Sequence, residues 1–325
     1  MRAVVLNEDR SLSVVNQPDP RPATGEAVVR VTGCGICGSD LHSVAAMGPP
    51  GTVLGHEIAG VVAELGRGVT NVKVGDIVAV RPFSGCGTCA YCLSGRADHC
   101  AAFGLVGYQR PGGYAEATVA VADELYRLPA AVRAEDRALV EPFAVARRGL
   151  RRGALRAGES VIVLGAGPIG LAVTHWARAL GAESIVVSDP LPQRRALAEQ
   201  LGATRAVHPD EIAGTTAPLV VECSGTRSLI DQAMQLADVD GRVAVVGMCL
   251  ANDTIFPWWG LHKELDVRFS IYYGREDFTD TIDALASGVL APDGLVTETI
   301  GLDAVPERFA RLRTEADAGK VVITP

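Results

Sequence analysis

Four cysteines are crowded into residues 85–100, which read GCGTCAYCLSGRADHC. They are Cys86, Cys89, Cys92 and Cys100, half of the eight cysteines in this 325-residue chain. Short C-x2-C steps fold back and present thiolates to one tetrahedral zinc ion, and four cysteine ligands leave no open position. A [4Fe–4S] cluster also takes four cysteines, but its C-x2-C-x2-C-x3-C-P pattern is not met because the last gap here is seven residues. We therefore predict a structural zinc in this loop.

A second set of possible metal ligands lies upstream, in CGICGSDLH (residues 34–42) and GHEIAGVVAELGRGV (residues 55–69). The thiolate of Cys37, the imidazole of His56 and the carboxylate of Glu57 are ligands that a catalytic zinc takes while one position stays free. Each residue alone is a weak signal, because a single histidine before an apolar strand usually packs or caps. The C-x2-C pair that ends at Cys37 is also compatible with a redox dithiol.

The second half of the chain carries a nucleotide-binding pattern. A β-rich apolar run leads into GAGPIG (residues 165–170), and LAVTHWARAL continues with helical spacing. The next strand-like run, SIVVSD, ends in Asp189, nineteen residues beyond Gly170. Strand, glycine turn, helix, strand and terminal acid together are typical of a dinucleotide-binding unit. We expect the pyrophosphate at the helix N-terminus, where free N–H groups favour negative charge.

The three glycines of this turn have different predicted roles. Gly165 permits a tight turn, Gly167 lets the backbone approach the pyrophosphate, and Gly170 lets the helix pack on the strand. Further strand-like runs begin near Leu219 and Arg242, and another covers residues 267–272. Alternation of strands and helices predicts a parallel, doubly wound α/β sheet.

The bulk composition excludes several classes of protein. A net charge of −8 argues against a general nucleic-acid surface. The one basic cluster has helical spacing and is expected to be a solvated face; it comprises Arg147, Arg148, Arg151, Arg152 and Arg156. No signal peptide is visible, and glycines and a proline interrupt the longest apolar stretch, so we expect no membrane span and a cytoplasmic protein. Reduced thiols in that compartment bind metal more often than they form disulfides.

CGICGSDLH, the GHE-x2-G-x5-G run and the four-cysteine loop, in this order, resemble the zinc-dependent medium-chain dehydrogenases/reductases. The resemblance covers nearly the whole chain. It implies an N-terminal GroES-like β-barrel catalytic domain and a Rossmann domain with a doubly wound parallel sheet. The expected limits are 1–148 for the catalytic domain with its zinc lobe at 85–100, 149–288 for the NAD-binding domain, and 289–325 for the return to the catalytic domain.

The same resemblance implies roles in the first half. Cys37 and His56 would hold the catalytic zinc, with Glu141 in LVEPFAVA as the third ligand and Glu57 beside the metal as an outer or exchanging ligand. A cysteine stands at the Glu141 position in liver-type alcohol dehydrogenases, so this chain is nearer to the polyol and threonine branch.

A proton relay follows from the same resemblance. Ser39 would take the proton from the bound alcohol, and His42 would pass it to solvent through the ribose hydroxyls. Histidine suits this task because its unperturbed pKa is near neutral. Without the flanking motif, a helix cap and a surface histidine would be the simpler interpretations of these two residues.

In the second half the resemblance implies an NAD site that comprises Gly165, Gly167, Ile169, Gly170, Asp189, Arg194, Val246 and Gly247. Asp189 would accept hydrogen bonds from the adenosine ribose and repel a 2′-phosphate, which predicts NAD in preference to NADP. Arg194 would cover the adenine, and Val246 and Gly247 would lie by the nicotinamide. A simple helix-capping role for Asp189 remains the alternative.

The expected activity is reversible hydride transfer between a secondary alcohol and NAD, with two zinc ions per chain and a homodimer or homotetramer as the assembly. A polyol, a cyclic alcohol and an amino alcohol all remain open as substrates. Aromatic residues Trp258, Trp259, Tyr272 and Tyr273 are consistent with a substrate cleft and equally with a core or a subunit interface. Two other functions stay open: a zinc-independent enone or quinone reductase on the same scaffold, and a non-catalytic NAD-binding protein.

Overall fold

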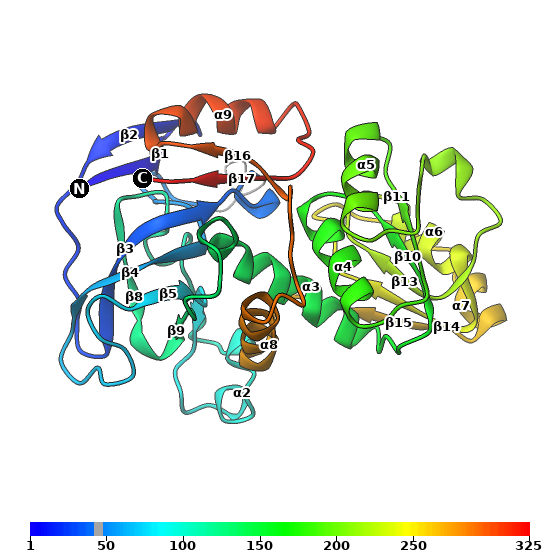
Figure 1. The fold of residues 1–325 in the computed structure, drawn as a ribbon, viewed down its shortest axis with the longest axis horizontal. Coiled ribbons are helices and arrows are strands. Elements are labelled where there is room, and N and C mark those ends of the chain that lie inside the picture. The colour runs from blue at the N-terminus through cyan, green and yellow to red at the C-terminus, as the bar shows by residue number, and fades with distance from the viewer. Residues whose placement is uncertain (42–47) are drawn as a thin grey trace.

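The computed structural model describes residues 1–41 and 48–325. Figure 1 shows two bodies side by side, a β-rich one that contains both termini and an α/β one built from the middle of the chain. Helix α3 (Val140–Arg152) lies between them, and α8 (Arg275–Ala286) packs against it. In the described part of the chain, no helix is long and apolar enough to cross a membrane.

The β-rich body is built on one sheet in the order β16-β17-β3-β4-β5-β9, with β8 paired to β3. Its strands are β3 (Glu26–Gly35), β4 (Glu57–Leu65), β5 (Ile77–Val80), β8 (Ala117–Val121), β9 (Leu125–Arg127), β16 (Val296–Ile300) and β17 (Lys320–Ile323). The hairpin of β1 (Arg2–Leu6) and β2 (Leu12–Asn16) and helix α9 (Val305–Leu312) pack against the same core.

Three strand ends meet at one place in this sheet. Strand β3 pairs antiparallel with β4, so that Gly35 lies opposite Glu57, and with β17, so that Val322 also lies opposite Gly35. The residues that follow β3 are therefore next to the start of β4 and to β17. Antiparallel pairing thus brings together segments that are far apart in the sequence.

A small lobe leaves the β-rich body between β6 (Phe83–Ser84) and β7 (Gly104–Leu105), which pair with each other. The lobe contains α2 (Ala90–Leu93) and a 3-10 turn at Ala97–His99. In Figure 1 it projects below the barrel. Further 3-10 turns lie at Ala122–Glu124, Ala134–Leu139, Pro209–Glu211 and Leu302–Ala304.

The α/β body holds a six-stranded parallel sheet in the order β12-β11-β10-β13-β14-β15. The strands are β10 (Ser160–Leu164), β11 (Ser184–Ser188), β12 (Arg205–Val207), β13 (Ala217–Glu222), β14 (Ala237–Val245) and β15 (Asp266–Phe269). Its helices are α4 (Pro168–Ala179), α5 (Pro192–Gln200), α6 (Leu229–Leu236) and α7 (Trp258–Lys263).

Strand β10 shows why this sheet needs an uninterrupted apolar sequence. Val161 and Val163 belong to a core that includes α3, α4 and α8, whereas Ile162 and Leu164 belong to a second core that includes α6. Successive side chains of a strand point to opposite faces, so helices on both faces require apolar residues at consecutive positions. The predicted doubly wound parallel sheet is confirmed.

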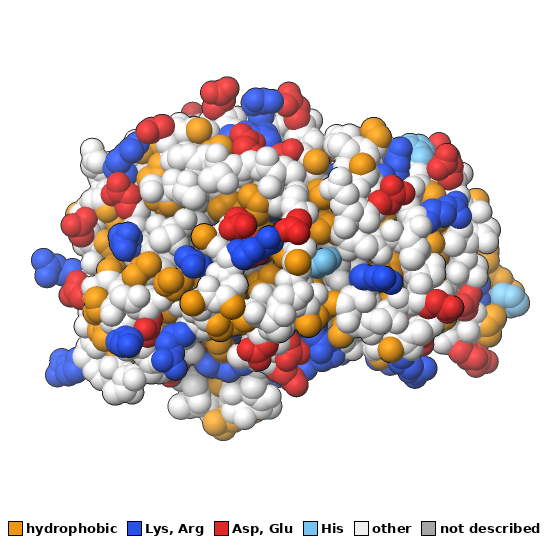
Figure 2. Space-filling view, in the orientation of Figure 1, with side chains coloured by type: hydrophobic (Ala, Val, Ile, Leu, Met, Phe, Trp, Pro, Cys, Tyr) orange, Lys and Arg blue, Asp and Glu red, His pale blue; other side chains and the backbone are white. Residues whose placement is uncertain are grey.

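Only part of the basic cluster forms the solvated face that we expected: Arg152 and Arg156 are exposed, whereas Arg147, Arg148 and Arg151 are half-buried. Arg147 Nη2 lies 3.0 Å from Asp280 Oδ2, and Arg151 Nη2 lies 2.8 Å from Asp277 Oδ2. These ion pairs join α3 to α8, so two of the arginines hold helices together at the centre of the molecule. On the face in Figure 2, acidic and basic side chains are interspersed and no large patch of one sign appears.

The strand-like run at residues 267–272 is shorter in the structure than expected. Strand β15 ends at Phe269, and Tyr272 has a positive φ of 55°, which an extended strand does not allow. Trp258 and Trp259 begin α7, which Figure 1 places at the far end of the α/β body from the barrel. The aromatic residues are thus divided between two regions, and the tryptophans lie away from β3 and β4.

Candidate functional site

Cys37, His56 and Glu57 lie together where β3, β4 and β17 meet. One ligand atom from each lies within 4.8 Å of the others. His56 and Glu57 are buried, and Cys37 is half-buried. A zinc ion binds sulfur, nitrogen and oxygen at roughly 2.0–2.3 Å. Two ligands of one ion therefore lie at most about twice that bond length apart, and the spacing of these three atoms fits a single zinc ion.

A buried carboxylate that the sequence did not single out stands behind His56. Asp40 is fully buried, and its Oδ1 lies 3.4 Å from His56 Nδ1. Its Oδ2 accepts hydrogen bonds from the Tyr114 hydroxyl at 2.7 Å and from the Cys37 backbone N–H at 3.2 Å. A carboxylate beside one ring nitrogen fixes the imidazole so that its other nitrogen faces a metal. An acid three residues after Cys37 was the available sequence signal.

The charges in this cluster shift the pKa values of both partners. Burial disfavours a charged imidazole, but the charges of Asp40 and Cys37 outweigh that effect and raise the pKa of His56 well above its usual range. Burial likewise opposes ionisation of Asp40, yet His56 holds the pKa of Asp40 below its usual value. A metal ion at His56 must therefore displace a proton from the ring.

Glu57 is held from its other side by Lys320, the first residue of β17. Lys320 Nζ lies 2.6 Å from Glu57 Oε1 and donates to the Ile36 carbonyl at 3.1 Å. Glu57 Oε2 is buried without a hydrogen-bond partner among the described residues, and a Cβ on Gly35 would come within 1.9 Å of it. An orphaned buried oxygen beside a thiol and an imidazole fits a divalent metal ion.

Glu141 lies in the first turn of α3, buried but outside the group of three ligand atoms. Burial raises the pKa of Glu141 to about 7, with His56 opposing and Glu57 reinforcing the shift. Burial, and then the charge of Glu141, raise the pKa of Tyr273 well above its usual range. Of the two candidate carboxylates, the structure thus brings Glu57 into ligand spacing and places Glu141 nearby.

The structure describes only one of the two expected relay residues. Ser39 belongs to a helical turn at residues 38–41, and its hydroxyl donates a hydrogen bond to Cys37 Sγ at 3.3 Å. Ser39 therefore stands next to a predicted metal ligand. His42 lies outside the described residues, so its relay role stays a prediction.

The four cysteines of the lobe also converge, with one sulfur from each within 4.8 Å of the others. Cys86 Sγ and Cys92 Sγ are 4.0 Å apart. A Zn–S bond of about 2.3 Å places tetrahedral sulfur ligands roughly 3.8 Å from one another, so this spacing fits zinc. Backbone N–H groups of Cys86, Cys89 and Cys92 already point at sulfurs, at distances of 3.3–3.5 Å.

Local hydrogen bonds tune these thiols. Those from Thr88 and from the Cys89 backbone lower the pKa of Cys86 to about 5, whereas desolvation raises the pKa of Cys92 to about 12. Gly85 lies against the cluster, since a Cβ there would come within 2.5 Å of Cys92 Sγ. One preformed thiolate can capture a cation, which then drives deprotonation of the others.

The glycine turn of the α/β body has the geometry that its sequence predicted. Gly165 has a φ of 94°, and Gly167 is the N-cap of α4. A Cβ on Gly170 would lie 1.8 Å from the Gly165 carbonyl oxygen, so no other residue fits there. Gly167 is open by comparison, because the atom nearest to a Cβ at that position would be Arg194 Nη1, at 3.9 Å. Ile169 follows in the first turn of α4.

Asp189 follows β11 and is almost fully buried. Its Oδ2 accepts a hydrogen bond from the Ala166 N–H at 2.8 Å and its Oδ1 one from the Leu191 N–H at 2.9 Å. Asp189 thus bonds the N–H of Leu191, the residue that precedes α5, and the same carboxylate also ties the glycine turn to β11. Each oxygen keeps a second lone pair. Arg194 Nη1 stands 3.7 Å from Asp189 Oδ2.

Val246 and Gly247 follow β14, and their N–H groups donate to the Glu222 carbonyl at 2.8 and 2.9 Å. They share an edge of the sheet with the glycine turn, because all six strands are parallel. Carboxyl ends of parallel strands form the ligand-binding edge of such a sheet. The predicted cofactor residues are thus gathered on one edge.

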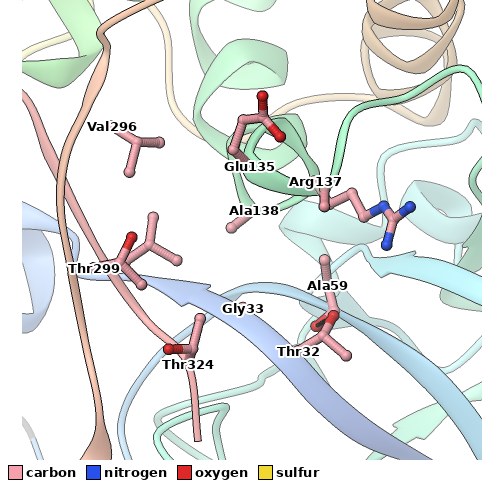
Figure 3. Close-up of a pocket in the computed structure, with 11 residues that line it drawn as sticks. Thr32, Gly33, Ala59, Glu135, Arg137, Ala138, Val296, Thr299 and Thr324 are labelled. Atoms are coloured by element: carbon pink, nitrogen blue, oxygen red, sulfur yellow. Dashed lines mark hydrogen bonds between the residues drawn. The ribbon is translucent and has the colours of Figure 1, made fainter.

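A separate hollow of about 70 Å³ opens on the β-rich body (Figure 3). Its lining residues are Thr32, Gly33, Ala59, Ala134, Glu135, Arg137, Ala138, Val296, Thr299, Val322 and Thr324. None of them is a predicted metal, relay or cofactor residue. This hollow is therefore distinct from the two metal clusters.

Two family models match the chain: an alcohol dehydrogenase GroES-like domain over residues 23–130 and a zinc-binding dehydrogenase domain over residues 168–287. The chain belongs to the zinc-binding alcohol dehydrogenase family. Its predicted fold, its alcohol oxidoreductase activity, and its zinc and nicotinamide cofactors are confirmed.

Relatives cover the whole length of the chain. A 2-dehydro-3-deoxy-L-galactonate 5-dehydrogenase from Pseudoalteromonas atlantica is 33% identical over 97% of this chain and 96% of its own. A crystal structure of an alcohol dehydrogenase from Escherichia coli CFT073 complexed with NADH is 28% identical, with a TM-score of 0.93 over 100% of this chain and 99% of that one. A putative zinc-binding dehydrogenase from Sinorhizobium meliloti bound to NADP is 30% identical, with a TM-score of 0.94 over 100% and 99%.

Proposed function

We propose that this dehydrogenase transfers hydride reversibly between a secondary alcohol and NAD, at a zinc ion held by Cys37 and His56 with Glu57 or Glu141. The buried cluster of thiol, imidazole and an orphaned carboxylate oxygen carries this proposal. Zinc, when bound, polarises the alcohol oxygen and lowers the pKa of its proton. The four lobe cysteines hold a second, structural zinc.

The chain's own groups position that chemistry. Asp40 holds the His56 ring, and Lys320 neutralises one oxygen of Glu57 while leaving the other free for a cation. Ser39, which donates to Cys37 Sγ, takes the alcohol proton, and His42 passes it to solvent. A hydroxyl and an imidazole in sequence make a proton path from a closed site to water.

NAD is the proposed cofactor, in preference to NADP. Asp189 is a carboxylate at the end of the second strand of the nucleotide unit, where a 2′-phosphate would meet a like charge. Its two backbone hydrogen bonds fix the carboxylate in place. Arg194, which is within 3.7 Å of this carboxylate, covers the adenine.

The substrate is a secondary alcohol of the polyol, cyclic or amino-alcohol type. The Pseudoalteromonas relative, a 5-dehydrogenase of a sugar acid, supports oxidation of a secondary carbon. The half-buried Tyr272 ring also supports this class; it packs 5.0 Å from Phe103 and 5.5 Å from the buried Phe83. Such rings offer contact to carbon–hydrogen faces of a substrate.

A homodimer or homotetramer is the proposed assembly, formed through the open edge of the parallel sheet. Strand β15 is the last strand on that side. Phe269, Ile271 and Leu261 beside this edge are 65%, 57% and 74% exposed. A second copy on a twofold axis would pair with the edge and cover these side chains.

The eight free cysteines support a cytoplasmic location.

The test is an alcohol panel assayed by nicotinamide absorbance, with metal analysis of the same samples. Wild-type protein should oxidise a secondary alcohol with NAD, and Cys37→Ser should abolish the activity. An enone reductase would reduce activated double bonds after metal removal, and a non-catalytic protein would bind NADH without turnover. Either result would contradict the proposal.

A further inference from the structure

The strand order fixes where a dinucleotide crosses the α/β body. From β10 the chain proceeds outward to β11 and β12, and then returns to β13 on the opposite side of β10. Ligands bind outside the carboxyl ends of the strands at such a switch point. Because Asp189 marks the adenosine side after β11, the other half of the dinucleotide must extend over the ends of β13 and β14.

An unusual buried acid lies on that second side. Glu222, the last residue of β13, is 0% exposed, and no lysine or arginine of the described residues forms an ion pair with it. Its Oε1 accepts backbone hydrogen bonds from Ser224 at 2.7 Å and from Gly225 at 2.8 Å. Its own carbonyl accepts the N–H groups of Val246 and Gly247. One residue therefore ties together the loops that follow β13 and β14.

Close backbone contacts make these two loops a single surface. A Cβ on Gly225 would lie 2.6 Å from the Met248 carbonyl oxygen, and a Cβ on Gly247 would lie 2.1 Å from the Gly225 nitrogen. The loop also reaches the glycine turn, because a Cβ on Gly165 would lie 3.0 Å from Ser224 Cβ. The three segments pack directly against one another, so a shift in one must move the others.

Glu222 Oε2 sits inside this contact. It is buried without a hydrogen-bond partner in the described chain, and it lies 2.5 Å from where a Cβ on Gly247 would be. A buried carboxylate without a cation is costly, and a fully apolar residue here would avoid that cost. An apolar side chain would, however, leave the Ser224 and Gly225 N–H groups without their acceptor.

We propose that Glu222 is a positioning residue for the nicotinamide half of the cofactor. Its side chain fixes the loop at residues 223–226 and its main chain fixes residues 246–247, so that both present their surface to the nicotinamide riboside. Glu222 does not touch the cofactor; it acts through these two loops. The proposal rests on the proposed function only in taking a nicotinamide dinucleotide as the ligand.

Binding of cofactor fragments tests this division of the site. NADH and 5′-AMP are titrated into the zinc-loaded protein by calorimetry, without any alcohol. Glu222→Ala should raise the Kd for NADH at least tenfold and leave the Kd for 5′-AMP within twofold. Asp189→Ser, on the other side of the switch point, should weaken both ligands. Glu222→Gln keeps an acceptor oxygen and should stay within about threefold of wild type for NADH.

Two further variants guard the interpretation. Glu199→Gln changes an exposed acid on α5 and should bind both ligands like wild type. Glu222→Asp retracts the carboxylate from Ser224 and Gly225, and should show the alanine pattern if Glu222→Ala does not fold. Equal loss of 5′-AMP and NADH, or no loss of NADH, in these Glu222 variants would overturn the proposal. Since no turnover is measured, this outcome is independent of whether an alcohol substrate is found.

Discussion

The two halves of this dehydrogenase build their sites from different parts of the chain. In the β-rich half, side chains form the sites: sulfur, imidazole and carboxylate at the catalytic cluster, and four sulfurs at the lobe. In the α/β half the site is formed mainly by the main chain, through N–H groups and glycines at the carboxyl edge of the sheet. Exchange of a ligand atom should therefore break the first kind of site, whereas added bulk should break the second.

The largest effect is expected at the catalytic cluster. Cys37→Ser should remove one of two zinc ions and lower turnover by on the order of a thousandfold or more, because polarisation of the alcohol contributes several kcal/mol.

Cys89→Ser should remove the other zinc and destabilise the lobe, since α2 has no buried residues to hold it. Metal analysis, turnover and thermal unfolding separate the two. A wild-type protein with only one zinc per chain would show that one cluster is misassigned.

The corresponding experiment in the α/β half adds a single methyl group. Gly170→Ala places a carbon 1.8 Å from the Gly165 carbonyl oxygen, so the turn must move. We expect NADH affinity to fall by at least a hundredfold, or the domain to lose stability by a few kcal/mol, as overpacking against backbone does. Gly301→Ala is the matched control, because nothing lies within 4 Å of a Cβ there. Similar NADH affinity together with similar stability in both variants would contradict the main-chain description.

Removal of one partner from the buried Glu57–Lys320 pair should have a large effect on stability. Both side chains are buried, so Lys320→Met leaves a carboxylate without its cation. Loss of one partner of a buried pair typically costs about 3–5 kcal/mol. Urea unfolding should show this loss in zinc-depleted protein, and bound zinc should reduce it. Lys320→Arg keeps the charge and should lose less; equal stability of Lys320→Met and wild type would show that the pair is not formed.

A smaller effect is expected for cofactor choice. Asp189→Ser should weaken NAD and relieve the clash with a 2′-phosphate, so that the ratio of kcat/KM for NAD over NADP falls by about tenfold or more. Loss of the hydrogen bond to the Ala166 N–H should also loosen the glycine turn. Steady-state kinetics with both cofactors measure the ratio. Better efficiency of the wild type with NADP than with NAD would refute the preference.

The smallest effect concerns the contact between the two halves at His175 of α4. Its Nδ1 lies 3.0 Å from the Leu201 carbonyl oxygen, and its Nε2 accepts from the Ala291 N–H at 3.0 Å. Burial holds the pKa of His175 below its usual value, so the folded state favours the neutral ring. The contribution of the neutral ring to the free energy of unfolding is complete above about pH 6.5, the pKa of histidine in the unfolded chain. This contribution is lost as the pH falls through the lower pKa of His175 in the folded state.

Protonation would convert Nε2 from a hydrogen-bond acceptor into a donor, so the bond from the Ala291 N–H would be lost. This loss would lower the free energy of unfolding by about 1 kcal/mol. The free energy of unfolding, measured by urea at several pH values, should therefore drop more in wild type than in His175→Gln below pH 6.5. Parallel pH profiles for the two proteins would exclude this role.

Local sequence patterns were sufficient to predict the cysteine cluster of the lobe, the glycine turn and the parallel sheet. Cysteine spacing predicted the lobe cluster, and GAGPIG predicted the turn in which Gly165 takes a positive φ and Gly170 excludes a Cβ. Alternation of strand-like and helical runs predicted the parallel sheet. These features depend on neighbours within one segment, so the residue types and their spacing already contain the necessary geometry.

The sequence alone did not reveal Asp40 and Lys320 as the partners of His56 and Glu57, because long-range pairing brings them there. Lys320 reaches Glu57 only because β17 and β4 both border β3, far from one another along the chain. Glu222 likewise lies in the strand-like run that begins near Leu219, and nothing in that run indicates that the loops after β13 and β14 share this residue. Partners that meet through strand order leave no periodic signal in a single sequence, so only the tertiary structure decided them.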